Sequence, residues 1–165
     1  MKIAIISDIH DNLPNLDKAL CEINKEQIET ILCPGDLANS EALEHLAAGF
    51  TGDIYLVQGN ACSYTAADCA LYKNIHNLGR RGGVINLAGQ KIGLCHEPKL
   101  ATTLLEQNPD IIFYGHTHKP YEDKAPNGTR LVNPGNVSNF DFPPTFAIYD
   151  TATEDIRLIL IDELP

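Results

Sequence analysis

The sequence predicts an α/β protein in which two β-sheets pack together with helices on the outside. Apolar, β-branched strand segments alternate with helical segments in the first third of the chain, a pattern typical of parallel strand–helix units. Hairpins follow in the second half, which adds antiparallel strands. No linker, low-complexity tract or repeat interrupts the 165 residues, so we expect one domain spanning residues 1–165.

The first predicted unit is a strand, a loop and a helix. Residues 2–7 are apolar and β-branched and are followed at once by polar residues, which predicts a buried strand that ends in a loop. Pro14 suits the first turn of a helix. Apolar residues at helical spacing then extend this helix to about Lys25.

The second unit repeats this order. Residues 29–33 predict a strand, and Ser40 is a suitable N-cap for a helix over residues 41–48 that Gly49 stops. Residues 53–57 predict a third strand, which would lie parallel to the first two.

The rest of the chain is richer in hairpins. The stretch up to Gly83 is irregular or weakly helical. A turn at residues 88–90 then joins two strands, and Pro98 begins a helix that ends near Gln107. The strands predicted after Gly83 are residues 84–87, 91–95, 110–114, 130–132, 145–149 and 156–161, of which the last two form a second hairpin.

The charge of the chain constrains its partners. Twelve Lys and Arg stand against 22 Asp and Glu, a formal net charge of −10. Because long nucleic acids are bound chiefly through Lys and Arg, this charge argues against such a partner, and the Arg80–Arg81 pair is a small exception. An acidic protein that handles phosphate needs local positive charge, which bound metal ions supply.

The sequence also favours a cytoplasmic location. No apolar run is long enough to span a membrane, and the N-terminus lacks the regions of a signal peptide. The cysteines form no close CxxC pair and their number is odd, which favours a reducing compartment. We expect them to be small buried hydrophobes, with Cys62 and Cys95 nearest to the candidate ligands described next.

Polar, metal-competent residues recur directly after the predicted strands. Because sites in open α/β sheets form at the carboxyl ends of strands, we expect these loops to converge. Carboxylate, amide and imidazole groups together make a mixed N/O ligand set, which suits Mn, Fe, Co, Ni or Zn better than Mg or Ca. The residues are Asp8, His10, Asp36, Asn60, His96, His116 and His118.

Each of these motifs is weak when it is considered alone. Asp36 and Asn60 each follow a glycine, and such pairs are more often turns than ligands. His116 and His118 are a stronger signal, because residues two apart at a strand end point the same way and Gly115 lets the backbone approach a ligand. Order and placement together favour a metal site. Two histidines outside the pattern, interpreted as ordinary surface residues, are His45 and His76.

The motifs SDIHDN, PGDLANS, QGNA, CHEP, YGHTH and NPGN resemble those of the calcineurin-like metallophosphoesterase superfamily, and within it the small YfcE-type phosphodiesterases. The resemblance covers nearly the whole chain and implies a four-layer αββα sandwich with two mixed β-sheets. It also implies two divalent transition-metal ions, with Mn expected before Ni, Fe, Co or Zn. Asp8, His10 and His118 would hold one ion and Asn60, His96 and His116 the other, with Asp36 bridging the two.

The activity implied by the resemblance is hydrolysis of a small soluble phosphate ester. Among such esters, a phosphodiester is the expected substrate. Two divalent ions lower the pKa of a bridging water, which attacks the phosphorus as hydroxide, and they stabilise the attacking and leaving oxygens. Asn12 would support the first loop or contact phosphate, and the turn at residues 133–136 would brace the site. The candidate catalytic residues are Asp36, Asn60, His96, Asn12 and Glu97.

The sequence departs from the family pattern at two places. Relatives often have an acid or a histidine shortly after the Gly-Asn motif, where this chain has Ala61 and Cys62. Relatives commonly have His-Gly-His where this chain has His96-Glu97-Pro98. Glu97 either replaces the missing acid or repels an anionic substrate. A general acid contributes about 10²–10⁴-fold, so we expect slower hydrolysis of esters with poor leaving groups.

The alternative function is a scaffold. A subunit of the retromer coat resembles the same family and serves in assembly, but scaffolds of that kind tend to lose ligands, and all seven are retained here. A metal store is disfavoured, since storage requires no open loops that face phosphate. The sequence does not identify the natural substrate or decide whether the chain forms a homo-oligomer.

Overall fold

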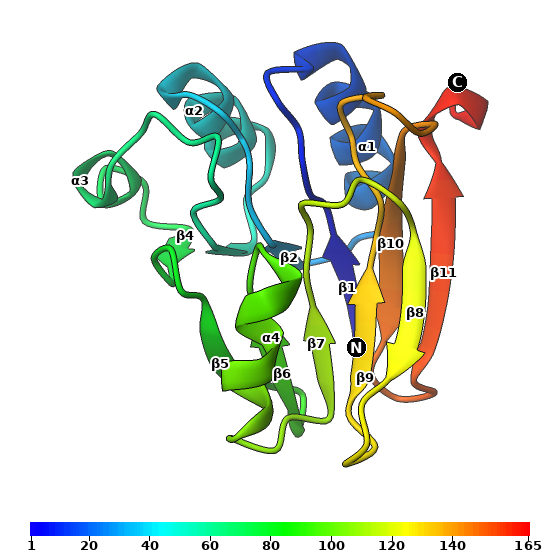
Figure 1. The fold of residues 1–165 in the computed structure, drawn as a ribbon. Coiled ribbons are helices and arrows are strands. Elements are labelled where there is room, and N and C mark those ends of the chain that lie inside the picture. Colours follow the sequence, from blue (N-terminus) through cyan, green and yellow to red (C-terminus); the bar gives the residue numbers. More distant parts are fainter.

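Two mixed β-sheets form the centre of the computed structural model, which describes all 165 residues (Figure 1). In the first sheet the four consecutive strands of the strand–helix units are parallel, and a C-terminal hairpin adds antiparallel strands to one edge. The strand order is β11 (Asp155–Leu160), β10 (Thr145–Asp150), β1 (Lys2–Ile5), β2 (Thr30–Cys33), β3 (Asp53–Leu56) and β4 (Ile75–Asn77).

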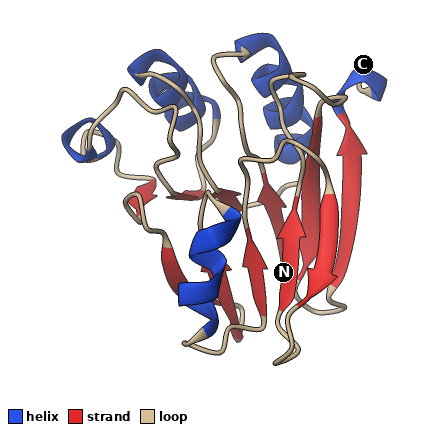
Figure 2. Ribbon diagram, in the orientation of Figure 1, coloured by secondary structure: helices blue, strands red, loops and turns tan.

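The second sheet has five strands, of which three are parallel and the two at the edges are antiparallel. Their order is β5 (Gly83–Leu87), β6 (Gln90–Leu94), β7 (Ile111–Phe113), β9 (Arg130–Asn133) and β8 (Tyr121–Lys124). The helices are α1 (Leu13–Lys25), α2 (Ser40–Gly49), α3 (Ala66–Cys69), α4 (Pro98–Leu105) and a final 3₁₀ turn, Ile161–Glu163 (Figure 2). No helix has both the length and the apolar character needed to cross a bilayer.

Three separate hydrophobic cores show that the elements form four layers. One core joins α1 and α2 to the outer face of the first sheet, a second lies between the sheets, and a third joins α4 to the outer face of the second sheet. In β1, Ile3 and Ile5 belong to the middle core while Ala4 belongs to the outer one, because successive side chains of a strand point to opposite faces. The predicted αββα sandwich is therefore confirmed.

The start of α2 differs from the prediction by one residue. Asn39, rather than Ser40, is the N-cap, and its side-chain oxygen accepts a hydrogen bond of 3.0 Å from the Ala42 backbone N–H. Asn and Ser cap helices about equally well, so local sequence did not separate them. Gly49 is the last helical residue rather than the residue that stops the helix.

Two edge strands, β4 and β8, were not predicted from the sequence. In β4 only Ile75 is buried, and all four residues of β8 are exposed. Neither segment therefore shows the apolar alternation that marks a strand, and polar residues are common on edges because they discourage unwanted pairing. The short helix α3 lies in the stretch predicted to be irregular or weakly helical.

Glu26, directly after α1, forms ion pairs with residues of β1 and β11. Lys2 of β1 donates a hydrogen bond of 2.8 Å to its carboxylate, and Arg157 of β11 contacts the other carboxylate oxygen. The hydrogen bonds from Lys2 and Arg157 lower the pKa of Glu26 below its ordinary value. The carboxylate form therefore stabilises the fold at neutral pH.

We expect Glu26→Gln to lower the free energy of unfolding by about 1 kcal/mol at pH 7, the sum of two surface ion pairs. Because the folded pKa is lowered, this contribution is present above the unfolded pKa and is lost as the pH falls through the folded pKa. Urea unfolding at several pH values measures the difference. Glu163→Gln is the matched control, since Glu163 is exposed and has no ion pair. An effect of Glu26→Gln that stays constant as the pH falls through the range in which carboxylates titrate would contradict this account.

Candidate metal centre

The predicted ligands lie in loops at the carboxyl ends of five strands, and these loops meet at one end of the two sheets (Figure 1). The strands of each sheet that carry them are parallel, so their carboxyl ends fall at the same edge. The ligands come from both sheets: Asp8 and His10 follow β1, Asp36 follows β2, Asn60 follows β3, His96 follows β6, and His116 and His118 follow β7.

Asp8, His10 and His118 form the first group of donor atoms. The Nε2 atoms of His10 and His118 are 3.2 Å apart. Asp8 Oδ1 lies 3.4 Å from His118 Nε2 and 3.9 Å from His10 Nε2. The Asp8 carboxylate is fully buried, and its orientation is set by the Ser7 hydroxyl and the His116 backbone N–H, which both donate to it. The three side chains therefore face a common point.

The second group surrounds His96. Its Nε2 atom lies 3.1 Å from Asp36 Oδ2 and 2.9 Å from Asn60 Oδ1. The same Asn60 oxygen is 2.9 Å from His116 Nδ1. The Ala61 backbone N–H donates a hydrogen bond of 2.8 Å to the other oxygen of Asp36 and fixes that carboxylate. All seven predicted residues are thus gathered in two adjoining groups.

Two aspartates lie between the groups. Asp8 is close enough to contribute to both the first group and a set formed with Asp36 and His96. Asp36 Oδ2 also borders both, at 3.1 Å from His96 Nε2 and 3.8 Å from His10 Nε2. The resemblance assigned the bridging position to Asp36 alone.

The chemistry of the second group fits a cation. The Pro34 carbonyl oxygen can only accept a hydrogen bond, so His96 Nδ1, 2.8 Å away, carries a proton. In the neutral ring Nε2 then presents a lone pair towards Asp36 Oδ2, which is also an acceptor. Facing lone pairs repel unless a positive charge lies between them. A divalent ion meets this requirement, and a proton on His96 is the other cation that does.

The pKa values of the metal-free groups follow the same electrostatics. Burial is the largest single influence and disfavours charge on both His96 and Asp36, but their mutual hydrogen bond and the neighbouring charges together outweigh it, which raises the pKa of His96 and lowers that of Asp36. The hydrogen bond with Asp8 raises the pKa of His118, against a smaller effect of burial. The Asp36 carboxylate is therefore held in the charged form that binds cations.

The backbone of the site is strained. A positive φ angle is uncommon for residues with a side chain and costs about 1–3 kcal/mol, and it persists only where the surroundings enforce it. Such strain clusters at functional sites. Five of the seven predicted ligands have it: Asp8 (+53°), His10 (+43°), Asp36 (+53°), His116 (+71°) and His118 (+59°).

Two glycines allow the loops to approach one another. A Cβ atom on Gly59 would lie 1.9 Å from Asp36 Oδ1, and one on Gly115 would lie 2.2 Å from Ser7 Oγ and 2.6 Å from Asp8 Oδ2. Real contacts are never this short, so a larger residue at Gly115 would displace these side chains. At Gly59 the Asp36 backbone nitrogen, 2.6 Å from the added Cβ, would have to move as well. Gly115 thus lets the loop after β7 approach Ser7 and the predicted ligand Asp8.

Asn12 supports the first loop. Its side-chain oxygen caps α1 by accepting from the Asn15 N–H at 3.1 Å, and its amide donates to the Ser138 carbonyl at 3.0 Å. Both polar ends of the side chain are used inside the protein. Of the two roles predicted for Asn12, the contacts match loop support rather than phosphate contact.

Glu97 is poorly suited to act as an acid. Its carboxylate lies 2.6 Å from Lys99 Nζ, and the hydrogen bond with Lys99, followed by the charge of Lys99 and then of His116 and His96, lowers the pKa of Glu97. A carboxyl group with a lowered pKa is ionised at neutral pH and has no proton to donate. The structure therefore gives no support for Glu97 as a replacement for the missing acid.

The turn at residues 133–136 braces the site, as expected. Asn133 donates to the Gly115 carbonyl at 2.9 Å, and Asn136 donates to the His118 carbonyl at 3.1 Å. These bonds hold the loop after β7 from behind. They also satisfy the hydrogen-bonding capacity of two backbone carbonyl groups in this loop.

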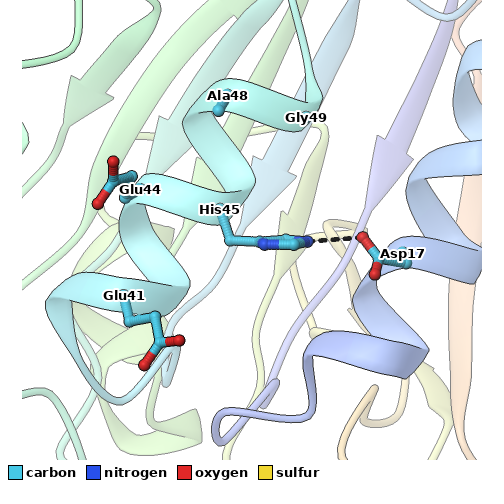
Figure 3. Close-up of a pocket in the computed structure, with 6 residues that line it drawn as sticks. All are labelled: Asp17, Glu41, Glu44, His45, Ala48 and Gly49. Atoms are coloured by element: carbon cyan, nitrogen blue, oxygen red, sulfur yellow. Dashed lines mark hydrogen bonds and ion pairs between the residues drawn. The ribbon is translucent and has the colours of Figure 1, made fainter.

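The remaining histidines lie outside the site, as predicted. His45 of α2 pairs with Asp17 of α1 at 2.6 Å across a hollow (Figure 3), and His76 pairs with Asp53 at 2.7 Å. The hollow contains none of the predicted ligands. It is lined by Asp17, Glu41, Glu44, His45, Ala48 and Gly49.

The cysteines differ in part from the expectation. Cys33, Cys69 and Cys95 are buried, but Cys21 is exposed because it lies on the solvent face of α1, so the expectation is wrong there. Cys62 is half-buried beside the site, with its sulfur 3.3 Å from the Tyr64 hydroxyl oxygen and 3.9 Å from Asp36 Oδ1.

Sequence reasoning missed two residues that adjoin the first group. The Phe140 ring centroid lies 5.5 Å from that of His10, and Asp141 Oδ2 lies 3.8 Å from His118 Nδ1. Both are in the loop between β9 and β10, which has no motif of its own in a single sequence. Only its proximity to the NPGN turn pointed towards the site.

Comparisons with known proteins identify the family of this chain. The family described as the calcineurin-like phosphoesterase superfamily domain matches residues 1–154. A phosphodiesterase of Methanocaldococcus jannaschii is 25% identical over 171 residues, which cover 98% of this chain and 100% of that protein.

Solved structures show the same fold. An archaeal phosphodiesterase has a TM-score of 0.84 at 24% identity, covering 97% of this chain and 99% of its own. The phosphoesterase YfcE of E. coli has a TM-score of 0.69 at 21% identity, covering 98% and 100%. The vacuolar sorting protein 29 of Entamoeba histolytica, complexed with Zn²⁺, has a TM-score of 0.68 at 23% identity, covering 96% and 90%.

The family match extends over every loop that carries a predicted ligand, and the family implies divalent metal ions, for which the two donor groups are candidate sites. The solved structure of YfcE shares the fold of this chain, in agreement with the resemblance to the YfcE-type group. This chain belongs to the calcineurin-like phosphoesterase superfamily and is a hydrolase that acts on phosphoric esters.

Proposed function

We propose that this protein is a phosphodiesterase that hydrolyses a small soluble phosphate ester at a pair of divalent transition-metal ions. The observation that carries the proposal is the convergence of seven polar side chains, whose nearest donor atoms lie 2.9–3.9 Å from one another. Such a concentration of imidazole, carboxylate and amide groups is typical of a transition-metal centre.

The two donor groups suggest how the ions are shared. The first ion would be held by Asp8, His10 and His118 and the second by Asn60, His96 and His116, with Asp36 in contact with both. When bound, two divalent ions neutralise phosphate charge and make water a stronger nucleophile. The mixed N/O donor set suits Mn, Ni, Fe, Co and Zn alike. Mn remains the first candidate on the family resemblance.

The protein itself orients these ligands. The hydrogen bond from His96 Nδ1 to the Pro34 carbonyl fixes the tautomer and turns Nε2 towards the site. Ser7 fixes the Asp8 carboxylate in the same way, and Ala61 fixes that of Asp36. Because the ligands are held before substrate arrives, little reorganisation is needed in the transition state.

Two exposed arginines, Arg80 and Arg81, support an anionic substrate. Arg80 and Arg81 are exposed and have no ion pair, whereas the other two arginines pair with glutamates. Their loop runs beside the strand ends that carry the second donor group, since the Gly79 carbonyl accepts from Gln58 N–H and Gly82 packs against Cys95. These charges would attract phosphate in a chain that is otherwise acidic.

Protonation of the leaving group is the weak step. Glu97 is ionised, and neither Ala61 nor Cys62 carries a titratable acid suited to the task. The leaving oxygen must then depart without a proton from these positions or take one from solvent. Activated diesters are therefore favoured over unactivated esters.

We expect Cys62→Asp to raise kcat/KM for unactivated esters by about tenfold or more and for nitrophenyl esters by less, because a general acid matters most for poor leaving groups. The Cys62 sulfur lies 3.9 Å from Asp36 Oδ1, so a carboxyl group there borders the site, where it can pass a proton to the leaving oxygen. Rates on both substrate classes measure the effect, with Cys62→Asn as the control. Equal gains on both classes would count against this account.

The proposed function is tested by hydrolysis assays on metal-stripped protein. Mn²⁺, Ni²⁺, Co²⁺, Zn²⁺ and Mg²⁺ are added back separately, with bis-p-nitrophenyl phosphate and p-nitrophenyl phosphate as substrates. We expect metal-dependent turnover that is higher for the diester. Binding of about two ions per chain without turnover of either ester would instead favour the scaffold function.

A further inference from the structure

Phe140 differs from the other phenylalanines in being largely exposed. Its exposed fraction is 54%, whereas the exposed fractions of Phe50, Phe113 and Phe146 are 2% or less. A single exposed apolar side chain is ordinary on a protein surface, so exposure alone carries no argument. The position of this ring is what distinguishes it.

The ring lies against two predicted ligands of the first donor group. Its centroid is 5.5 Å from that of His10, with the rings tilted by 52°. It is 6.5 Å from that of His118, in a stacked arrangement with only 22° between the planes. Phe140 therefore stands directly beside the donor atoms, with the rest of its ring open to solvent.

Hydrogen bonds hold the loop that carries the ring. The Phe140 backbone N–H donates to Asn136 Oδ1 at 3.1 Å, and the Phe142 N–H donates to the Phe140 carbonyl at 2.7 Å. The Ser138 N–H donates to the Asp8 carbonyl at 3.0 Å. Asn136 also bonds the His118 carbonyl, so the ring and the ligands share one set of anchors.

We propose that Phe140 is a stacking platform that binds a planar aromatic group of the substrate, an aryl ring or a nucleobase, beside the metal centre. The inference rests on the proposed function, because it takes the phosphate to bind at the metal ion that His10 and His118 would help to hold. A group esterified to that phosphate extends over the adjacent surface, where the open part of the Phe140 ring lies.

Stacking on an aromatic side chain is well suited to this task. It contributes substantially per ring and tolerates differences between bases, because every base has a π-face. The platform therefore selects for aromaticity rather than for a particular hydrogen-bonding pattern. An ester with only a methyl or sugar group gains nothing from Phe140.

Isothermal titration calorimetry on the Mn²⁺-loaded protein tests the platform without requiring turnover. Two ligand pairs are compared: phenylphosphonate with methylphosphonate, and adenosine 5′-monophosphate with ribose 5-phosphate. We expect wild-type protein to bind the aromatic member of a pair more tightly than the other member. Phe140→Ala should lower the affinity for the aromatic member by about tenfold. The non-aromatic members should bind both proteins alike.

Matched variants separate stacking from other roles. Phe140→Trp should keep the preference and Phe140→Leu should lose it, while Leu71→Ala, at another exposed apolar residue, should bind like wild type. A preference in only one pair identifies the aryl ring or the nucleobase as the ligand. An unchanged preference in Phe140→Ala overturns the proposal. Equal loss of all four ligands also overturns it, since Phe140 would then only shield the metal ligands.

The two proposals fail in different ways. If no ester is turned over but the aromatic preference depends on Phe140, the catalytic proposal fails and the platform remains. If turnover depends on metal but Phe140→Ala changes the affinity for none of the four ligands, the platform proposal fails and the catalytic proposal remains.

Discussion

Asp36→Asn is expected to lower kcat/KM for bis-p-nitrophenyl phosphate by about 10³-fold, the largest effect of any single ligand change. The Asp36 carboxylate is buried, with one oxygen 3.1 Å from His96 and 3.8 Å from His10, so it borders both donor groups. A neutral amide there removes a charge that both ions would share, and metal ions contribute several kcal/mol to transition-state stabilisation. The assay is turnover at saturating Mn²⁺, together with the number of ions bound per chain.

Two comparisons sharpen this result. Asp17→Asn, in the hollow between α1 and α2, changes the same functional group outside the site and should leave turnover normal. Asp8→Asn decides which aspartate is shared, since Asp8 adjoins both sets of donor atoms as well. A greater loss in Asp8→Asn would move the bridging position to Asp8. Near-normal turnover in Asp36→Asn would refute the two-metal assignment.

Gly59→Ala is expected to have the second largest effect, through loss of metal binding and of stability. The added Cβ atom would lie 1.9 Å from Asp36 Oδ1 and 2.6 Å from the Asp36 backbone nitrogen, so the backbone itself must move. Overpacking of this kind costs about 1–3 kcal/mol of folding free energy. Mutation of a residue that holds a metal ligand in place typically lowers the metal affinity by about 10–100-fold. Thermal unfolding and calorimetric titration with Mn²⁺ measure the two effects.

Gly83→Ala is the matched control for this substitution. A Cβ atom on Gly83 meets nothing within 4 Å, and the residue has no positive φ angle. The control should retain wild-type metal affinity and stability. Gly59→Ala with unchanged affinity for both ions would show that the loop after β3 does not position Asp36.

Most of the secondary structure could be predicted because its signals are local. The helix α1 has an apolar face at regular spacing and a proline in its first turn, and it occupies the predicted residues. Buried strands such as β1 and β2 are continuous apolar runs. The edge strand β8 consists of four exposed residues, so only pairing with β9 makes it a strand, and pairing is not a local property.

The candidate site was predictable to the level of residue type and order. The seven side chains follow strand ends, and parallel strands bring such ends together, so their convergence was expected. Their assignment as ligands stays a prediction for the variants above. Phe140 could not be foreseen, because its place beside His10 depends on how the loop after β9 folds back over the loop after β1.

The layers of the fold, the family and the kinds of donor atoms that follow each strand could all be predicted without coordinates. These depend on periodicity and residue chemistry, which lie within a few positions of the chain. Only the tertiary structure decided that Asp8 as well as Asp36 adjoins both donor groups, that Glu97 is paired with Lys99, and that an aromatic ring flanks the site. The reason is physical: Asp8 and His118 are 110 residues apart in the chain but 3.4 Å apart in space, and such distances are set by the packing of two sheets rather than by any local preference.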